Sequence, residues 1–207
     1  MAVAQEIINY AKSLFDVVGI SESTSNNKTL IIGLESTPER NIDEFAWENE
    51  RFLNYGFEKH INSKLEAVLV FIRNKGFEAD LIGKYGYPAR GQFNLKTEAI
   101  HAGLGKRGKS TVVINDQYGT RLRFAAISTN APLESSTSAR LPSEESPFCN
   151  ECTVCIDICP VSALNPYHMP DTSICLSNDR KMPQHKGRYI PCDLCLIRCP
   201  ANGEANH

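Results

Sequence analysis

Hydrophobic residues recur at helical spacing near the start of the chain, and short apolar runs follow. The first stretch, residues 7–18, predicts an amphipathic helix that Gly19 ends in a left-handed conformation. The run TLIIGLE at 29–35 is β-branched and short, which predicts a buried strand. A weaker strand is expected at 79–83. The apolar face of the first helix carries Ile7, Ile8, Ala11, Leu14, Phe15 and Val18.

Two further stripes at helical spacing lie between these strands. The first covers 42–53 and follows a Thr-Pro pair at 37–38, which suits the cap and first turn of a helix. The second covers 61–72, begins after a break near Gly56 and ends at Gly76. The stripes consist of Ile42, Phe45, Ala46, Phe52 and Leu53, and of Ile61, Leu65, Val68, Leu69 and Ile72.

Helix and strand alternate again in the middle of the chain. Residues 95–102 (LKTEAIHA) predict a helix with Asn94 as its N-cap, and 110–115 (STVVIN) predict a strand. The turn NDQYG, at 115–119, predicts a hairpin between that strand and a second one at 120–128. The pattern as a whole predicts a mixed α/β (α+β) core. One face of the second strand carries Leu122, Phe124 and Ala126.

The stretch HAGLGKRGKST, residues 101–111, contains both GxGxxG and GxxxxGK[ST]. A nucleotide-binding loop needs a strand before its glycines and a helix after them, because the helix N-terminus faces the phosphates. Here a predicted helix precedes the glycines and a predicted strand follows, so both motifs are expected to be false positives. The loop cations are expected to be solvated, with contact to an anionic cofactor as the alternative: Lys106, Arg107 and Lys109.

Composition narrows the class of protein. The chain has 207 residues, of which 42% are apolar and 22% charged, as in folded soluble proteins. A net charge of -2 and a pI near 6.2 argue against a nucleic-acid partner. No signal peptide and no apolar run of membrane-spanning length is found, so we expect a cytoplasmic protein with no membrane contact.

Cysteines divide the chain. All eight lie between residues 149 and 199, after a Ser-, Pro- and Glu-rich connecting segment at 131–147. We therefore expect two domains, residues 1–144 and 145–207. Because cytoplasmic thiols stay reduced, metal or redox chemistry is a better explanation than disulfides.

The cysteine spacing indicates iron–sulfur clusters. Residues 149–160 match the ferredoxin pattern CxxCxxCxxxCP, and a shortened CxxCxxxCP run covers 192–200. In two-cluster modules the fourth cysteine of a run binds the other cluster, and the isolated Cys175 completes the count. Zinc is the alternative, but zinc ribbons usually offer separated CxxC pairs. The predicted ligands are Cys149, Cys152, Cys155 and Cys199 for cluster 1, and Cys159, Cys175, Cys192 and Cys195 for cluster 2.

These motifs, in this order, resemble a known superfamily. The segment AGLGKRGKSTVVINDQYGTRLRFAAISTNAPL at 102–133, followed by CNECTVCIDICPVSAL and CDLCLIRCP, is similar to the epoxyqueuosine reductases and reductive dehalogenases. The resemblance covers roughly the C-terminal half. It implies a nitroreductase-like core that binds a corrinoid (cobalamin), and a bacterial-ferredoxin-like domain whose two [4Fe-4S] clusters deliver single electrons to cobalt. Residues expected against the cofactor are Gly103, Gly105, Gly108, Lys109 and Tyr118.

The chain also departs from that superfamily. The family has a proton-donating Asp in a DSAP-like segment before the glycine loop, but YPARGQFNLKTEA contains none. Asn130 stands where the TDxPL segment has Asp, and the chain ends seven residues after Pro200. We therefore expect that epoxyqueuosine in tRNA is not the substrate, and no catalytic residue is assigned. The missing twin-Arg signal separates the chain from exported dehalogenases.

Two functions fit these observations. The first is a small cytoplasmic reductase whose clusters pass electrons to a corrinoid or another cofactor in the N-terminal domain. The second is a non-catalytic, ferredoxin-like electron carrier that reduces a partner protein. Tyr85, Tyr87 and Tyr118 would be hydroxyl donors in the first case and packing or interface residues in the second. Two clusters take the net charge from -2 to about -6, which favours a redox partner with a basic docking face.

Overall fold

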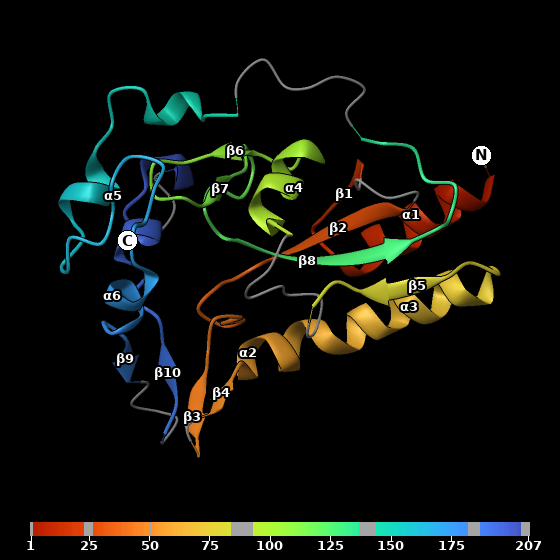
Figure 1. Cartoon of the computed structure of the whole chain (residues 1–207), viewed down its shortest axis with the longest axis horizontal. Helices are drawn as coiled ribbons and strands as arrows, with labels where there is room; N and C mark the ends of the chain where they lie inside the picture. The colour runs from red at the N-terminus through yellow and green to blue at the C-terminus, as the bar shows by residue number, and fades with distance from the viewer. Residues whose placement is uncertain are drawn as a thin grey trace.

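A four-stranded antiparallel sheet forms the centre of the computed structural model (Figure 1). The structure describes residues 2–22, 27–49, 51–83, 93–136, 144–181 and 187–203. Strand order is β1-β2-β8-β5, so the strand formed late in the chain lies between two early ones. The strands are β1 (Val17–Glu22), β2 (Lys28–Glu35), β5 (Ala79–Leu81) and β8 (Leu122–Thr129).

The two central strands are buried on both faces. Side chains alternate along a strand, so Leu30 and Ile32 of β2 join one hydrophobic core, and Ile31 joins another on the opposite face. The expected β8 alternation is confirmed, because Leu122, Phe124 and Ala126 share the face of Ile31. The result is three layers, with helices on either side of the sheet.

Helices α1 (Ala2–Leu14) and α3 (Ser63–Asn74) cover one face of the sheet. The predicted first helix was too long, because α1 ends at Leu14 and Val18 and Gly19 belong to β1. Gly19 has a packing role in place of the predicted cap. A Cβ there would lie 2.6 Å from the backbone oxygen of Ala102, so glycine allows the end of the facing helix to approach β1.

The helix predicted over 61–72 is confirmed, and it starts earlier than expected. Helix α2 (Tyr55–Phe57), a π-helical turn at Glu58–Asn62 and α3 follow without interruption. Gly56 therefore lies inside the helix, where we expected a break. Asn54 caps the start by accepting a hydrogen bond from the Phe57 amide at 3.2 Å, and Gly76, with a φ of 88°, follows the end.

The described residues 37–49 and 51–53 form no helix, contrary to the sequence prediction. This segment makes turns and then a hairpin of β3 (Ala46–Glu48) and β4 (Arg51–Leu53). Polar side chains hold the turns: the Ile42 amide donates to the Ser36 hydroxyl at 3.1 Å, and the Asp43 amide donates to Asn41 Oδ1 at 3.0 Å. Such local bonds compete with the helical backbone, so the apolar spacing alone was misleading.

Helix α4 (Leu95–His101) covers the other face of the sheet. Its predicted cap is confirmed, because Asn94 accepts a hydrogen bond from the Thr97 amide at 3.1 Å. The turn at 115–119 also forms, closed by two hydrogen bonds of 2.8 Å between Asn115 and Gly119. The predicted hairpin across this turn does not form. Strand β7 (Val113–Ile114) pairs instead with β6 (Lys106–Arg107), while β8 pairs with β2 along its whole length and with β5 over 127–129.

The cysteine-bearing segment lies beside one end of the sheet (Figure 1). Its hairpin of β9 (Arg180–Lys181) and β10 (Tyr189–Ile190) meets the region before β3, where Phe45 and Tyr189 exchange backbone hydrogen bonds of 2.9 and 2.8 Å. Nearby, Arg188 pairs with the buried carboxylate of Glu44 at 2.9 Å. The division at residue 145 remains a prediction. Among the helices of the described residues, none is long and apolar enough to cross a bilayer.

Candidate metal centre and adjoining cavity

Short helical turns carry the cysteines. Cys149 ends a 3-10 turn, Pro147–Cys149, and Cys199 precedes another, Pro200–Asn202. Three short helices carry Cys155, Cys175 and Cys195: α5 (Val154–Asp157), α6 (Thr172–Leu176) and α7 (Leu194–Ile197). Successive turns of this kind bring cysteines three residues apart to one side of the backbone, which is the arrangement that a CxxC step needs.

The four cysteines predicted for cluster 1 line one small cavity. Cys149 is buried and the other three are half-buried. Lys109 and Ser110, which follow the glycine loop, also line this cavity. The cavity is lined by Cys149, Cys152, Cys155, Cys199, Lys109, Ser110, Ile114, Phe148, Pro200 and Ala201.

The other four cysteines are also close to one another. Burial raises the pKa of Cys195 to about 12, and the charges of Cys175, Cys155, Cys192 and Cys159 add to the shift. Burial likewise raises the pKa of Cys175, with Cys192 and Cys159 contributing. Thiols gathered in this way stay protonated unless a bound cation stabilises the thiolates. Because Cys155 of the first group acts on Cys195, the two groups are neighbours.

Within the described ranges, no three His, Cys, Asp or Glu side chains are arranged around a single metal ion. A cubane cluster makes a different demand, because each of its four cysteines binds a different iron atom. The observed grouping of four and four cysteines suits two clusters of that kind.

The predicted cofactor residues of the glycine loop have structural roles here. Gly103 ends α4 with a φ of 75°, and its amide donates to the Ile100 carbonyl at 2.9 Å. Gly105 and Gly108 pack against β7. Tyr118 packs against the α4 core. Tyr85 and Tyr87 lie outside the described residues.

Two larger cavities adjoin the cysteine segment, with volumes of about 770 and 630 Å³. Both are lined by the 36–43 loop, the start of β8 and the segment around α7, and they share six residues. Lys109 and Tyr118 line neither of them. The shared residues are Asn41, Asp43, Arg123, Ile190, Asp193 and Leu196.

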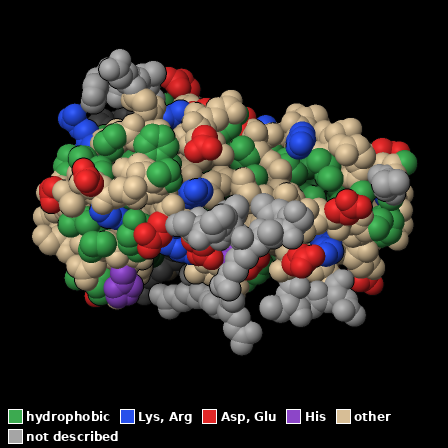
Figure 2. Space-filling model, turned by 90° about the horizontal axis from the view of Figure 1, so that it is seen from above, with side chains coloured by type: hydrophobic (Ala, Val, Ile, Leu, Met, Phe, Trp, Pro, Cys, Tyr) green, Lys and Arg blue, Asp and Glu red, His purple; other side chains and the backbone are tan. Residues whose placement is uncertain are grey.

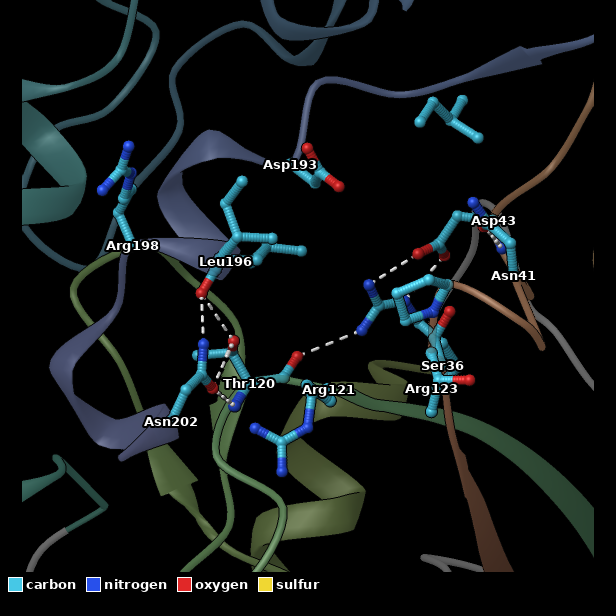
Figure 3. Close-up of a pocket in the computed structure, with 14 residues that line it drawn as sticks. Ser36, Asn41, Asp43, Thr120, Arg121, Arg123, Asp193, Leu196, Arg198 and Asn202 are labelled. Carbon is cyan, nitrogen blue, oxygen red and sulfur yellow. Dashed lines mark hydrogen bonds and ion pairs between the residues drawn. The ribbon is translucent and has the colours of Figure 1, made fainter. Parts of the chain in front are cut away.

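The two cavities together are called the double cavity here. Hydrogen bonds and an ion pair hold charged and polar side chains in place along its walls. Arg123 makes a two-pronged ion pair with Asp43, at 2.7 and 2.6 Å (Figure 3). Asn202 Oδ1 accepts hydrogen bonds from the amide and hydroxyl of Thr120, at 2.9 and 3.1 Å, and Asn202 Nδ2 donates to the Leu196 carbonyl at 2.7 Å. The cysteine segment is thereby attached to the start of β8.

Lys96 and Cys192 both line the second cavity. Desolvation by surrounding protein atoms lowers the pKa of Lys96 although the residue as a whole is exposed, the charges of Arg107 and Arg123 lower it further, and Cys195 and Cys175 oppose the shift. Its proton is therefore released more easily than that of a solvated lysine. Sequence reasoning missed Lys96, Asp43 and Arg123, because no local motif marks residues that meet only through tertiary contacts.

The fold is similar to those of solved epoxyqueuosine reductases and reductive dehalogenases. A solved selenomethionine-labelled epoxyqueuosine reductase superposes with a TM-score of 0.67 at 21% identity, covering 100% of this chain and 67% of that one. A reductive dehalogenase described as acting in B12-dependent dehalogenation superposes with a TM-score of 0.65 at 17% identity, covering 97% of this chain and 32% of that one. No family model matches the chain.

The sequence itself is similar to curated proteins named epoxyqueuosine reductase. The protein of that name from Leadbetterella byssophila is 29% identical over 178 residues, which cover 81% of this chain and 56% of the relative. The chain spans about half the length of the curated relatives it matches over most of its own length. The resemblance expected from the motifs, and the mixed helix-and-strand fold, are confirmed.

Proposed function

We propose that the chain is a small reductase in which two [4Fe-4S] clusters pass single electrons to a cofactor held in the double cavity. One observation carries this proposal. Cys192, a predicted ligand of cluster 2, lines the same cavity as Leu122, Arg123 and Phe124 of β8. A cluster at that place would therefore adjoin a site large enough for a cofactor.

The grouping of the cysteines supports the ligand sets predicted from the sequence. Cys149, Cys152, Cys155 and Cys199 line one cavity, and Cys159, Cys175, Cys192 and Cys195 form the other group. Iron binding would deprotonate these thiols and offset the burial that keeps them neutral. Anaerobic reconstitution followed by iron and sulfide analysis tests this step, and about eight irons per chain are expected.

A corrinoid is the proposed cofactor. The sequence relatives are named reductases, and one protein with this fold is described as B12-dependent. The cavities have the volume range of cofactor sites, and their walls supply fixed polar groups. When bound, a corrinoid supplies a cobalt centre that accepts one electron at a time. Arg123, Asp43, Thr120 and Asn202 would hold it, and Lys96 would keep a proton near it at Nζ.

The test is an anaerobic EPR titration of cob(II)alamin with the reconstituted protein. A stoichiometric change of the cobalt signal from the base-on to the base-off form is expected. Ile190→Trp, which fills the region shared by both cavities, should prevent the change. Val70→Trp is the matched control, because Val70 is exposed on α3 and lines neither cavity. An unchanged cobalt spectrum beside intact cluster signals would contradict the corrinoid proposal.

A second function, the electron carrier, is favoured by a separate observation. Large apolar side chains are exposed on the cysteine segment, including Phe148, Ile174, Leu176 and Ile197. Figure 2 shows hydrophobic side chains among acidic and basic ones at the end of the molecule where this segment lies. Exposed apolar groups of this kind suit docking of a partner protein. Cluster reduction without cobalamin binding would favour this function.

A further inference from the structure

Lys109, the lysine of the Walker-like motif, is fully engaged with the cysteine segment. Its ammonium Nζ donates hydrogen bonds to the carbonyl oxygens of Asn150 and Cys152, at 3.2 and 3.1 Å. Its amide donates to Cys149 Sγ at 3.4 Å. Its carbonyl accepts a hydrogen bond from the Tyr167 amide at 3.0 Å. Each polar group of Lys109 therefore contacts the segment that carries the predicted cluster ligands.

The glycine loop fixes this orientation. The Gly108 amide donates to the Val112 carbonyl at 2.8 Å, and the Thr111 amide donates back to the Gly108 carbonyl at 2.9 Å. This tight turn directs the Lys109 amide toward Cys149. A phosphate-binding lysine must keep its ammonium free for the anion, whereas here two of its three donors are used by carbonyls. The Walker-like motif thus positions Lys109 against the cysteine segment.

Electrostatics indicates how Lys109 would affect the reduction of a cluster bound by these cysteines. An oxidised [4Fe-4S] cluster with four thiolates carries about -2, and one added electron takes it to about -3. A nearby cation and an N–H donor to sulfur both stabilise the more negative, reduced state. Lys109 is half-buried and lines the cavity of Cys149, Cys152, Cys155 and Cys199, so water screens its charge only in part.

We propose that Lys109 raises the reduction potential of cluster 1. The inference rests on the proposed function only in that a cluster occupies the cavity lined by Cys149 and Cys199, and it is independent of any corrinoid. In the reaction considered, cluster 1 takes one electron from dithionite and no bond breaks. Cluster 2 lacks this lysine among the residues that line its neighbouring cavity, so its potential should not depend on Lys109.

The experiment is a redox titration of the reconstituted protein, followed by EPR. The cluster 1 signal is assigned by its loss in Cys149→Ser. Lys109→Met removes the ammonium but keeps the backbone N–H, and Lys109→Arg keeps a cation. Lys106→Met is the matched control, because it removes the same charge from the same hairpin at a position that does not line the cysteine cavity.

In Lys109→Met, we expect about tenfold less reduced cluster 1 at a fixed potential, which corresponds to about 59 mV for one electron. Lys109→Arg should restore most of the shift, and Lys106→Met and cluster 2 should be unchanged. An intact cluster 1 with unaltered potential in Lys109→Met would overturn the proposal. Loss of cluster 1 iron in both Lys109 variants would also overturn it, in favour of a purely structural role.

Measurements on the wild-type protein distinguish a failure of this inference from a failure of the proposed function. If reconstitution yields no [4Fe-4S] signals, the proposed clusters fail before Lys109 is tested. If clusters form but cobalamin does not bind, the corrinoid proposal fails while the Lys109 titration remains decisive.

Discussion

Replacing Gly119 with alanine tests how the cysteine segment is attached to the sheet. Gly119 has a φ of 55°, which costs an L-residue about 1 kcal/mol. An added Cβ would lie 2.2 Å from Asn202 Oδ1, which accepts both hydrogen bonds from Thr120. Displacing Asn202 would leave the amide of the buried Thr120 without its acceptor, at a cost of about 1–3 kcal/mol.

Gly76→Ala is the matched control. Gly76 has a φ of 88°, and a Cβ there meets nothing within 4 Å. This variant should therefore lose stability only because alanine disfavours a positive φ. We expect Gly119→Ala to be less stable than Gly76→Ala by about 2 kcal/mol, or about 4–8 °C in the thermal midpoint of a chain this size. Thermal melts of the reconstituted proteins, at one scan rate, measure the difference.

The double variant Gly119→Ala/Asn202→Ala sharpens the test. Asn202→Ala removes the atom that the new Cβ would strike. The double variant should therefore lose less stability than the two single variants lose together. Equal midpoints for Gly119→Ala and Gly76→Ala would refute the reasoning, as would strict additivity in the double variant. Either result would mean that the contact between the 115–119 turn and the C-terminal segment is not what holds them together.

Three further predictions follow from the site. Cys175→Ser should reduce bound iron to about half while keeping most of cluster 1, as iron analysis will show; full iron content would exclude Cys175 as a ligand. Lys109→Ala should leave ATP binding unchanged, because none is expected, and Lys109-dependent affinity in calorimetry would contradict this. Hydrogen bonds from His101 and then Arg107 lower the pKa of Glu144, although burial opposes the shift. Glu144 therefore stabilises the fold above its unfolded-state pKa, and this stability is lost as the pH falls through the lowered folded-state pKa. Glu144→Gln should flatten that acid limb in melts from pH 6 to about 3.

Local features were predictable from the sequence where the signal and the structure lie within a few residues of each other. Asn94 marks the start of α4 because a cap satisfies backbone groups only three or four positions away. The apolar stripe that ends at Gly76 predicted α3, because residues three and four positions apart share one face of a helix. Cysteine spacing likewise predicted two sets of four, by the rule that the last cysteine of each run belongs to the other set.

Tertiary structure decided the rest, because those features depend on which partners are available. The apolar stripe over 42–53 became a hairpin beside Tyr189, and β7 paired with β6 in place of β8. Lys109 looked like a phosphate ligand or a solvated charge until folding placed it on the backbone of the cysteine loop, about forty positions along the chain. The Asp43–Arg123 pair and the cavity around it arise from contacts of still longer range. The sequence by itself thus determined the start of α4 and predicted the cysteine sets, whereas the fold determined the strand pairing, the cavity and the contacts of the glycine loop, since no residue carries a local signal for its distant neighbours.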